Sequence, residues 1–331
     1  MGTLYVTEQG SSLRKTSGRL VVARKREVLA EIPCAKLESI FLYGAVQVTS
    51  QALAELLDQG IELAFFTLSG RLRGQITPPK AKNVVLRMKQ YEMAGDKQRC
   101  LDLSKEVITA KIANSAAVLR RYRRNHPDAV SRETLQELES SRERVAAVRT
   151  LDELRGVEGS AAARHFAAMA ALAPPSLGFT GRNRRPPRDP LNALLSFGYV
   201  LVGNEIQSLL DGMGFDPFIG FYHQIDYGRP SLALDLVEEL RAPLVDRFSL
   251  SLVSRRVLTP EDFTETPEKG VILQKPSLRN YFKAYEAELT RPMQVDGETL
   301  SFRHIFRRQA ERLARCLADG EPYRSFRWTA D

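Results

Sequence analysis

The sequence predicts an α+β protein in which a small, β-rich, sandwich-like N-terminal domain with one short helix precedes a larger all-α domain. Three observations predict this fold class. The first 78 residues alternate short β-prone runs with turn residues, whereas helical periodicity dominates the remainder. A Pro-Pro-Lys step at residues 78–80 separates the two patterns. The length of 331 residues exceeds what one hydrophobic core usually organises, so two domains are expected.

The N-terminal domain, residues 1–78, is expected to hold strands and one helix. Residues 50–60 change to a helical period, with Ser50 as a candidate cap and Gly60 as the end. Ser69-Gly70 is expected to turn a final hairpin. The expected strands are TLYVTEQ, LRKTSG, RLVVAR, VLAEIP, LESIFLYG, VQVTS, IELAFFT and RLRGQIT.

The rest of the chain is expected to be helical. Residues 79–96 are interpreted as a linker and first helix, and residues 97–331 as the helical domain. Long amphipathic stretches run from 97 to about 122, from 131 to 149 and from 151 to 172. A further apolar helix is expected after Asp189, which precedes Pro190 and can begin it.

The composition and the N-terminal sequence indicate the cellular location of the protein. No run approaches the roughly 18 to 20 uninterrupted apolar residues of a membrane helix, and the N-terminus lacks the basic and apolar regions of a signal peptide. Cys34, Cys100 and Cys316 are isolated and form no CxxC pair, which favours three reduced thiols over a zinc or redox site. We therefore expect a cytoplasmic protein without membrane contact.

Positive charge is concentrated in three segments. Lys and Arg number 48 against 40 Asp and Glu, a net charge of +8. Arginines cluster in RRYRR at 120–124, in GRNRRPPRDP at 181–190, and at helical spacing over 307–315. Such clusters suit a polyanion, because guanidinium groups pair with phosphates and release counterions. The alternative is a solvated helix face. The first two clusters favour nucleic acid, whereas the third leaves both interpretations open.

One stretch combines a histidine with a helical carboxylate pair. His223 ends an apolar run, and a helix is expected to begin near Ser231. Asp235 and Glu238 are three residues apart, so their carboxylates share one face of that helix. Carboxylate oxygens and an imidazole suit magnesium or manganese. Taken alone, these residues favour a hydrogen-bonded core histidine and solvated carboxylates.

A third carboxylate strengthens the metal-site interpretation. Glu158 is flanked by Gly156 and Gly159 and is followed by small residues, which could let another helix approach closely. The alternative is an exposed turn with Glu158 in solvent, which spacing does not exclude.

The combined motifs resemble the universal CRISPR adaptation integrase and endonuclease family, that of the first-numbered Cas protein. The matching text runs in order over nearly the whole chain and comprises GTLYV, LRGVEGSAAARHF, RNRRPPRDPLNALLSFGYVLVGNEI, GFDPFIGFYHQIDYGRPSLALDLVEELRAPLVD and EPYRSF. The N-terminal text is most similar to the form that accompanies type I-C systems.

The resemblance implies a site, partners and a reaction. It makes Glu158, His223 and Asp235 the catalytic metal ligands for Mg2+ or Mn2+, with Glu238 a doubtful fourth. It also implies a homodimer formed through the β-rich domain, the small second adaptation protein as partner, and double-stranded DNA as substrate. Spacer 3′-hydroxyls would be joined to the repeat array by transesterification, with hydrolysis of branched DNA as a side reaction.

Several residues are expected to contact this DNA. Arg182, Arg184 and Arg185 suit phosphate. Asn192 and Tyr199 lie on the helix that would line the cleft, although an aromatic residue at helical spacing is usually part of a core.

Two other functions remain open from the sequence. A non-catalytic DNA-binding scaffold would share the charge and the helices, and a phosphoesterase of small molecules would share the metal site. Arginine clusters spread over separate segments suit a long polyanion better than a small one. Convergence of Glu158, His223 and Asp235 in space would favour the enzyme over the scaffold.

Overall fold

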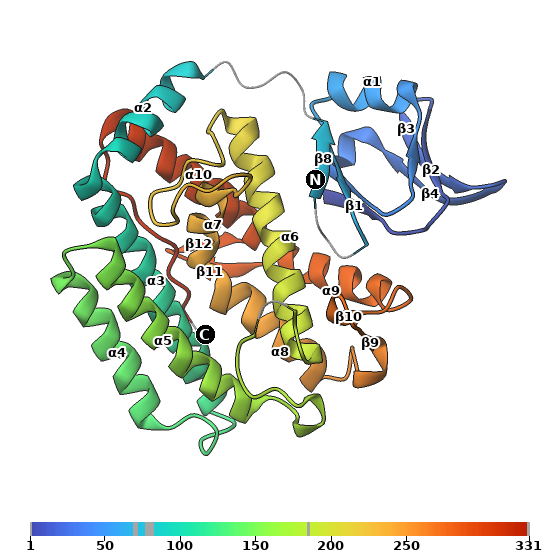
Figure 1. The fold of residues 1–331 in the computed structure, drawn as a ribbon. Coiled ribbons are helices and arrows are strands. Elements are labelled where there is room, and N and C mark those ends of the chain that lie inside the picture. Colours follow the sequence, from blue (N-terminus) through green and yellow to red (C-terminus); the bar gives the residue numbers. More distant parts are fainter. Residues whose placement is uncertain (1, 69–71, 77–82, 184–185, 330–331) are drawn as a thin grey trace. The chain divides into compact units, whose positions relative to one another are not determined.

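The computed structural model describes residues 2–68, 72–76, 83–183 and 186–329 (Figure 1). Contacts divide the chain into two units. The first comprises Met1–Ala81 and Lys275–Glu286, and the second comprises Lys82–Gln274 and Ala287–Asp331. No sequence pattern indicated that residues 275–286 join the N-terminal unit. The domain boundaries expected at 78 and 96 stay a prediction.

The N-terminal unit contains two four-stranded sheets, ordered β1-β5-β7-β8 and β4-β3-β2-β6 (Figure 1). Leu13 and Leu20 from one sheet share a core with Ile40 and Leu63 from the other, and each of the four is at most 1% exposed. The expected β-rich, sandwich-like unit is therefore confirmed. The strands are β1 (Gly2–Val6), β2 (Ser12–Thr16), β3 (Arg19–Arg24), β4 (Glu27–Pro33), β5 (Leu37–Tyr43), β6 (Gln47–Val48), β7 (Glu62–Phe66) and β8 (Leu72–Ile76).

Two helical segments complete this unit. Helix α1 (Ser50–Asp58) is capped by the Thr49 side chain, which accepts the Ala52 amide, so the cap lies one residue before the expected Ser50. The turn expected at Ser69-Gly70 lies outside the described residues. In the segment of residues 275–286, the Phe282 ring stacks on the Tyr5 ring, with 4.8 Å between the ring centroids. This aromatic contact helps to hold residues 275–286 against the sheet.

The second unit is built around a hairpin of long helices and the helix that follows it. Ile108 and Leu119 of α3, Leu138 of α4 and Leu154 of α5 are all fully buried and form one cluster. The helices are α2 (Val84–Gly95), α3 (Lys97–Arg123), α4 (Arg132–Ala147), α5 (Leu151–Leu172), α6 (Pro190–Met213), α7 (Ser231–Glu238), α8 (Arg247–Ser254), α9 (Leu278–Thr290, which spans both units) and α10 (Phe302–Asp319), with short helical turns η1 (Cys34–Lys36), η2 (Pro175–Leu177), η3 (Arg241–Asp246) and η4 (Pro260–Asp262).

This unit is mostly helical rather than all-helical. It contains two antiparallel hairpins, β9 (Phe263–Thr266) with β10 (Gly270–Leu273), and β11 (Met293–Val295) with β12 (Glu298–Leu300). The second hairpin turns at Asp296-Gly297, where both residues have positive φ. Asp-Gly is a strong hairpin signal. The strands are only three or four residues long, too short for their alternation to stand out beside the neighbouring helices.

Helix α6 begins where the sequence predicts. The Asp189 side chain accepts the amide of Asn192, and Pro190 occupies the first helical position. The helix is long and apolar enough to cross a membrane by length and composition alone. However, 61% of its most apolar window is buried inside the protein, as expected for a core helix.

Candidate active site

The Asp235 carboxylate organises the segment that precedes His223. Asp235 is 4% exposed, and its two oxygens accept the backbone amides of Phe221, Tyr222 and His223 at 2.6, 3.0 and 2.9 Å. Gly220 permits this close approach, because a Cβ there would lie 2.8 Å from Asp235 Oδ2. Helix α7 thus fixes the backbone that presents the histidine.

The imidazole of His223 is oriented by the same carboxylate. Its Nδ1 lies 2.7 Å from Asp235 Oδ1. A carboxylate accepts hydrogen bonds, so Nδ1 carries the proton and donates it. Nε2 lies 3.6 Å from Glu238 Oε1. The second ring nitrogen therefore faces the second carboxylate of α7.

Glu238 is buried among positive charges. It is 3% exposed, and its Oε2 lies 2.6 Å from Lys111 Nζ and 2.9 Å from Arg241 Nε. Burial acts to raise the pKa of this carboxyl, but the charges of Arg241, Lys111 and His223 outweigh it and hold the pKa below its ordinary value. Glu238 is therefore an anion inside the protein.

Glu158, which belongs to α5, lies close to the same lysine as Glu238. Its carboxylate pairs with Lys111, which therefore bridges Glu158 and Glu238. The flanking glycines do not explain this approach, because a Cβ at Gly156 or Gly159 would meet no atom within 4 Å. Helix α5 instead lies against its neighbours through buried residues such as Ala161. The role expected of the glycines is corrected accordingly.

Among the expected site residues, Asp235 is therefore placed differently from Glu158, His223 and Glu238. Glu158 and Glu238 share the Lys111 ammonium, and His223 Nε2 lies beside the other oxygen of Glu238. Asp235 stands behind His223, and both of its oxygens already accept amide protons. Within the described part of the chain, no three His, Cys, Asp or Glu side chains are already arranged as metal ligands.

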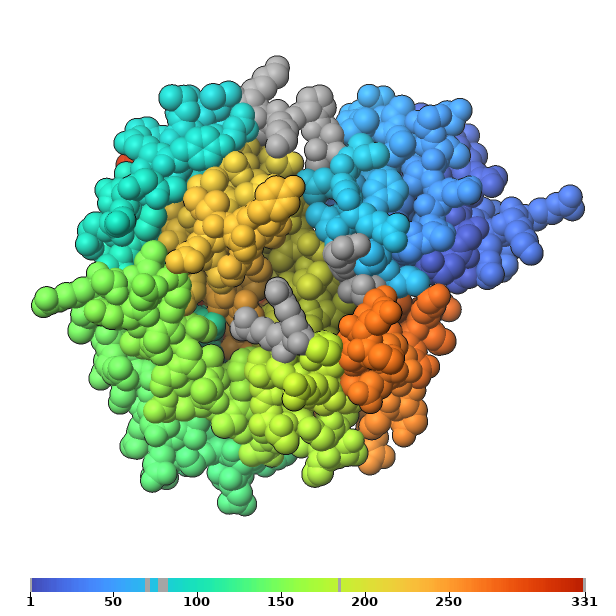
Figure 2. All heavy atoms as spheres, viewed as in Figure 1, coloured from blue at the N-terminus to red at the C-terminus, as the bar shows by residue number. Residues whose placement is uncertain are grey.

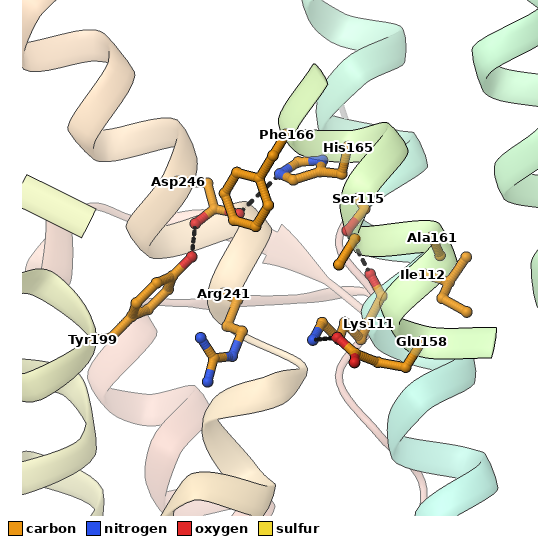
Figure 3. Close-up of a pocket in the computed structure, with 11 residues that line it drawn as sticks. Lys111, Ile112, Ser115, Glu158, Ala161, His165, Phe166, Tyr199, Arg241 and Asp246 are labelled. Carbon is orange, nitrogen blue, oxygen red and sulfur yellow. Dashed lines mark hydrogen bonds and ion pairs between the residues drawn. The ribbon is translucent and has the colours of Figure 1, made fainter. Parts of the chain in front are cut away.

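Lys111, Glu158 and Arg241 line a cleft with about 420 Å3 of empty volume, including space open to solvent. Figure 2 shows this unit hollowed between its green and gold segments. Figure 3 shows Lys111 and Glu158 on one side of the cleft, with Arg241, Tyr199 and Asp246 across from them. The lining residues are Lys111, Ile112, Ser115, Glu158, Ala161, Ala162, His165, Phe166, Tyr199, Arg241 and Asp246.

A buried network forms the far wall of the cleft (Figure 3). The Tyr199 hydroxyl donates to Asp246 Oδ1, and His165 Nε2 lies 2.8 Å from Asp246 Oδ2. The Arg241 guanidinium carbon lies 4.4 Å from the centroid of the Tyr199 ring. Burial and the Asp246 charge raise the pKa of Tyr199, so its hydroxyl stays protonated and remains a donor. The network holds Arg241 against Glu238.

The side chains expected to contact DNA differ in their burial and in their hydrogen-bond partners. Arg182 donates to Asn192 Oδ1 at 2.8 Å and to Ser196 Oγ at 3.1 Å. Asn192 is fully buried and Tyr199 is 8% exposed, so both side chains orient Arg182 and the cleft wall in this structure. Their DNA contacts stay a prediction. Arg184 and Arg185 lie outside the described residues.

Three cleft residues escaped the sequence analysis. Lys111 lies within a long helix and belongs to no motif, so only the fold brings it to the carboxylates. Arg241 follows Glu238 by three residues, a helical spacing that pairs opposite charges and could have been noticed. Asp246 belongs to no pattern that indicates a role, because its link to Tyr199 spans 47 residues.

Solved structures share this fold. A casposase bound to an integration product superimposes with a TM-score of 0.87 at 21% identity, covering 98% of this chain and 93% of that one. A CAS1 protein from Thermotoga maritima gives a TM-score of 0.82 at 24% identity, with 100% of both chains covered. At these identities the similarity shows the fold alone.

Sequence comparison identifies the family. A CRISPR-associated endonuclease Cas1 of Thermus thermophilus is 36% identical over 323 residues, covering 96% of this chain and 94% of that protein. A second Cas1 endonuclease, from Chlorobaculum tepidum, is 33% identical over 99% of this chain and 98% of its own length. The model of the family described as CRISPR associated protein Cas1 matches residues 4–287. The chain therefore belongs to the Cas1 family, as the sequence motifs predicted.

Proposed function

We propose that this protein is a metal-dependent DNA integrase and endonuclease of CRISPR spacer acquisition, which joins spacer 3′-hydroxyls to the repeat array. One observation carries the proposal. Glu158 from α5 and Glu238 from α7 share one cation, the Lys111 ammonium, at the edge of a cleft, and His223 Nε2 lies 3.6 Å from the other oxygen of Glu238. The family membership supports it, because curated members are named endonucleases.

The residues at this position fit a divalent ion. Two carboxylates and an imidazole are suitable ligands for Mg2+ or Mn2+. Neighbouring ligands of an octahedral ion at about 2.1 Å stand roughly 3 Å apart, and His223 Nε2 is 3.6 Å from Glu238 Oε1. The Lys111 ammonium, which bridges Glu158 and Glu238, shows that this carboxylate pair accommodates a cation.

The geometry favours Glu238 over Asp235 as the helical ligand. Asp235 accepts three backbone amides and the His223 imidazole, so its lone pairs are already engaged. Carboxylates that orient a ligating histidine are a common feature of metal sites. We therefore propose Glu158, His223 and Glu238 as ligands, with Asp235 fixing the tautomer and orientation of His223.

A bound ion would polarise a phosphoryl oxygen and lower the pKa of the attacking hydroxyl. The chain supplies the remaining functions. Arg241 and Lys111 place positive charge on the cleft walls, where charge develops on the phosphorus oxygens. Arg182, Arg184 and Arg185 are proposed to hold the DNA backbone, with Asn192 and Tyr199 supporting the same surface.

The proposed partners are a second copy of this chain and Cas2. One solved structure with this fold is described as a Cas6-RT-Cas1–Cas2 complex, with a TM-score of 0.81 at 22% identity. Another is described as a TtCas1-DNA complex. Those descriptions concern those proteins, and we extend them to this chain as a proposal. The cytoplasmic location and the type I-C form stay predictions.

The test is strand transfer of a short duplex with free 3′-hydroxyls into a supercoiled repeat plasmid, with Cas2 and either Mn2+ or EDTA. Wild type should give joined product only with the metal, and His223→Ala and Glu158→Ala should give none. Matched controls are His126→Ala and Asp152→Ala, because His126 and Asp152 are exposed and lie outside the cleft.

The alternatives predict other results. Product that persists in His223→Ala and Glu158→Ala would place the chemistry elsewhere. Tight DNA binding without product in any metal would favour the non-catalytic scaffold.

A further inference from the structure

The chain that follows α7 is an irregular junction that carries three site residues. Helix α7 ends at Glu238, Glu239 is its C-cap, and the π-helical turn η3 begins two residues later. The junction, residues 238–246, contains Glu238 and also Arg241 and Asp246, which line the cleft. Turns of this wide type often occur at functional sites. The contacts that fix the junction therefore fix part of the site.

The Asn114 side chain ties the junction to α3. Asn114 is 1% exposed and lies three residues after Lys111 on that helix. Its Nδ2 donates to the backbone oxygen of Glu239 at 2.7 Å. The residue next to Glu238 is thus bonded to the helix that carries Lys111. Asparagine is a poor helix former, so its position inside α3 is explained better by this hydrogen bond than by helix stability.

A second set of hydrogen bonds comes from Tyr323–Trp328, which we call the anchor segment. Figure 1 shows the chain after α10 running beside α3, where the Ser325 amide donates to Glu106. The Tyr323 hydroxyl donates to Glu239 Oε1 at 2.6 Å, and the Phe326 amide donates to Glu239 Oε2. Both carboxylate oxygens of the residue that follows Glu238 therefore accept protons from the anchor segment.

The anchor segment also binds Asn114 itself. The Trp328 amide donates to Asn114 Oδ1 at 2.8 Å, and Asn114 Nδ2 donates to the Phe326 carbonyl at 3.0 Å. Both ends of the Asn114 amide are engaged, because its oxygen accepts one bond and its nitrogen donates two. Helix α3, the junction and the anchor segment thus meet at two buried polar side chains, Asn114 and Glu239.

Ordinary core packing is a simpler explanation for the anchor segment. Tyr323, Phe326 and Trp328 are at most 8% exposed, and burying aromatic rings stabilises a fold wherever it occurs. Packing does not require the segment to place its hydrogen bonds on Asn114 and Glu239, beside the site. If packing is its only role, losing these bonds should lower stability alone. If the segment positions the site, losing them should also change metal binding.

We propose that the anchor segment, through Asn114 and Glu239, is a positioning element of the active site. It holds the junction, and with it Glu238, at a fixed place relative to α3 and Lys111. Asn114, Glu239 and the anchor segment act through Glu238 and need not touch metal or DNA. The identification of the site as a metal site rests on the proposed function.

The test uses the full-length chain with two variants that remove these bonds, Asn114→Ala and Tyr323→Phe. Arg327→Gln is the matched control within the same segment, because Arg327 pairs with Glu106 and not with Asn114 or Glu239. Leu138→Ala is the control for stability. Leu138 is fully buried in α4, which contributes no lining residue to the cleft, and its truncation lowers stability.

The first measurement needs no metal. Hydrogen exchange of the amides of residues 239–246, followed by mass spectrometry in EDTA, should be faster in Tyr323→Phe by about two- to tenfold, which corresponds to one net hydrogen bond. Asn114→Ala should show a larger increase. Trp328 is the only tryptophan of the chain, so acrylamide quenching of its fluorescence should increase in the same two variants. Arg327→Gln should exchange like wild type over these residues.

The second measurement is Mn2+ affinity by titration calorimetry, on variants that circular dichroism shows to be folded. Asn114→Ala should bind Mn2+ about tenfold more weakly, at the low end of the effect of residues that support metal ligands. Tyr323→Phe should change the affinity in the same direction by about two- to tenfold. Arg327→Gln and Leu138→Ala should keep the wild-type affinity.

Three outcomes would overturn the proposal. They are wild-type Mn2+ affinity in folded Tyr323→Phe, an equal loss of affinity in Leu138→Ala, and unchanged hydrogen exchange of the junction in Tyr323→Phe. Tyr323→Phe decides alone if Asn114→Ala does not fold. A wild-type chain that binds no Mn2+ would reject the proposed function, whereas the exchange measurement in EDTA would still decide whether the anchor segment positions the junction.

Discussion

Asp235 Oδ1 accepts both the backbone amide and the imidazole Nδ1–H of His223, at 2.9 and 2.7 Å. One oxygen thereby fixes the position of the histidine backbone and the rotation of its ring. The other ring nitrogen, Nε2, is left facing Glu238. This arrangement separates the role of orienting the histidine from the role of binding a metal.

Asp235→Asn should weaken metal binding without abolishing it. An amide group would oppose at least one of the three backbone donors, so His223 would lose its orientation. Loss of such a supporting carboxylate typically costs about 10–100-fold in metal affinity. Titration calorimetry with Mn2+ should show this reduction, whereas Glu238→Gln should leave no measurable binding. The reverse order of effects would make Asp235 the ligand.

Gly220→Ala should disturb the same site through sterics alone. Its Cβ would lie 2.8 Å from both Asp235 Oδ2 and the backbone carbon of Ser231. Overpacking of this kind costs about 1–3 kcal/mol, and strand transfer should fall with stability. Gly212→Ala is the matched control, because a Cβ there meets no atom within 4 Å in α6. Equal urea midpoints for the two variants would contradict the packing argument.

Tyr199→Phe should destabilise the protein although it preserves the ring. The change removes the hydroxyl that donates to Asp246 and leaves a buried carboxylate oxygen without that partner. An unsatisfied buried group costs about 1–3 kcal/mol, and more if charged. Urea denaturation should report this loss, whereas Tyr227→Phe should have no effect because Tyr227 is fully exposed. Arg241 should keep its ring contact, so activity should fall less than in Tyr199→Leu.

Glu239 should make stability depend on pH. Its buried carboxylate accepts the Tyr323 hydroxyl at 2.6 Å and the Gln309 amide at 3.0 Å. Burial nevertheless raises its pKa to about 7, against about 4.3 in an unfolded chain. The folded state holds the proton more tightly, so this contribution to stability is complete below about pH 4 and is lost as pH rises to about 7.

The corresponding measurement compares wild type with Glu239→Gln, which does not titrate. The free energy of unfolding of wild type relative to the variant should decrease between pH 4 and 8 by at most about 4 kcal/mol. A difference that stays constant over this range would mean that Glu239 does not titrate as its burial indicates.

The fold class was predictable because the sequence patterns that indicate it are local ones. Asp189-Pro190 predicts the start of α6, and the run after Ser231 predicts α7. Two short hairpins were missed because the strands have three or four residues each. The Asp296-Gly297 turn was a usable signal for one of them.

The site was predictable in its components but not in their roles. Asp235 and Glu238 share a helix face, and spacing treats them alike. Their difference arises from the segment before His223, which folds its amides onto Asp235 alone. Lys111 was beyond prediction, because its partner Glu158 is 47 residues away on another helix.

The most direct test of the central claim is a crystal structure of this protein with Mn2+, analysed by anomalous diffraction. We expect a single strong anomalous peak coordinated by Glu158, His223 Nε2 and Glu238, with Lys111 displaced from the two carboxylates and Asp235 still bound to His223 Nδ1. A peak coordinated by Asp235, or the absence of manganese from this cleft at saturating concentration, would contradict the account.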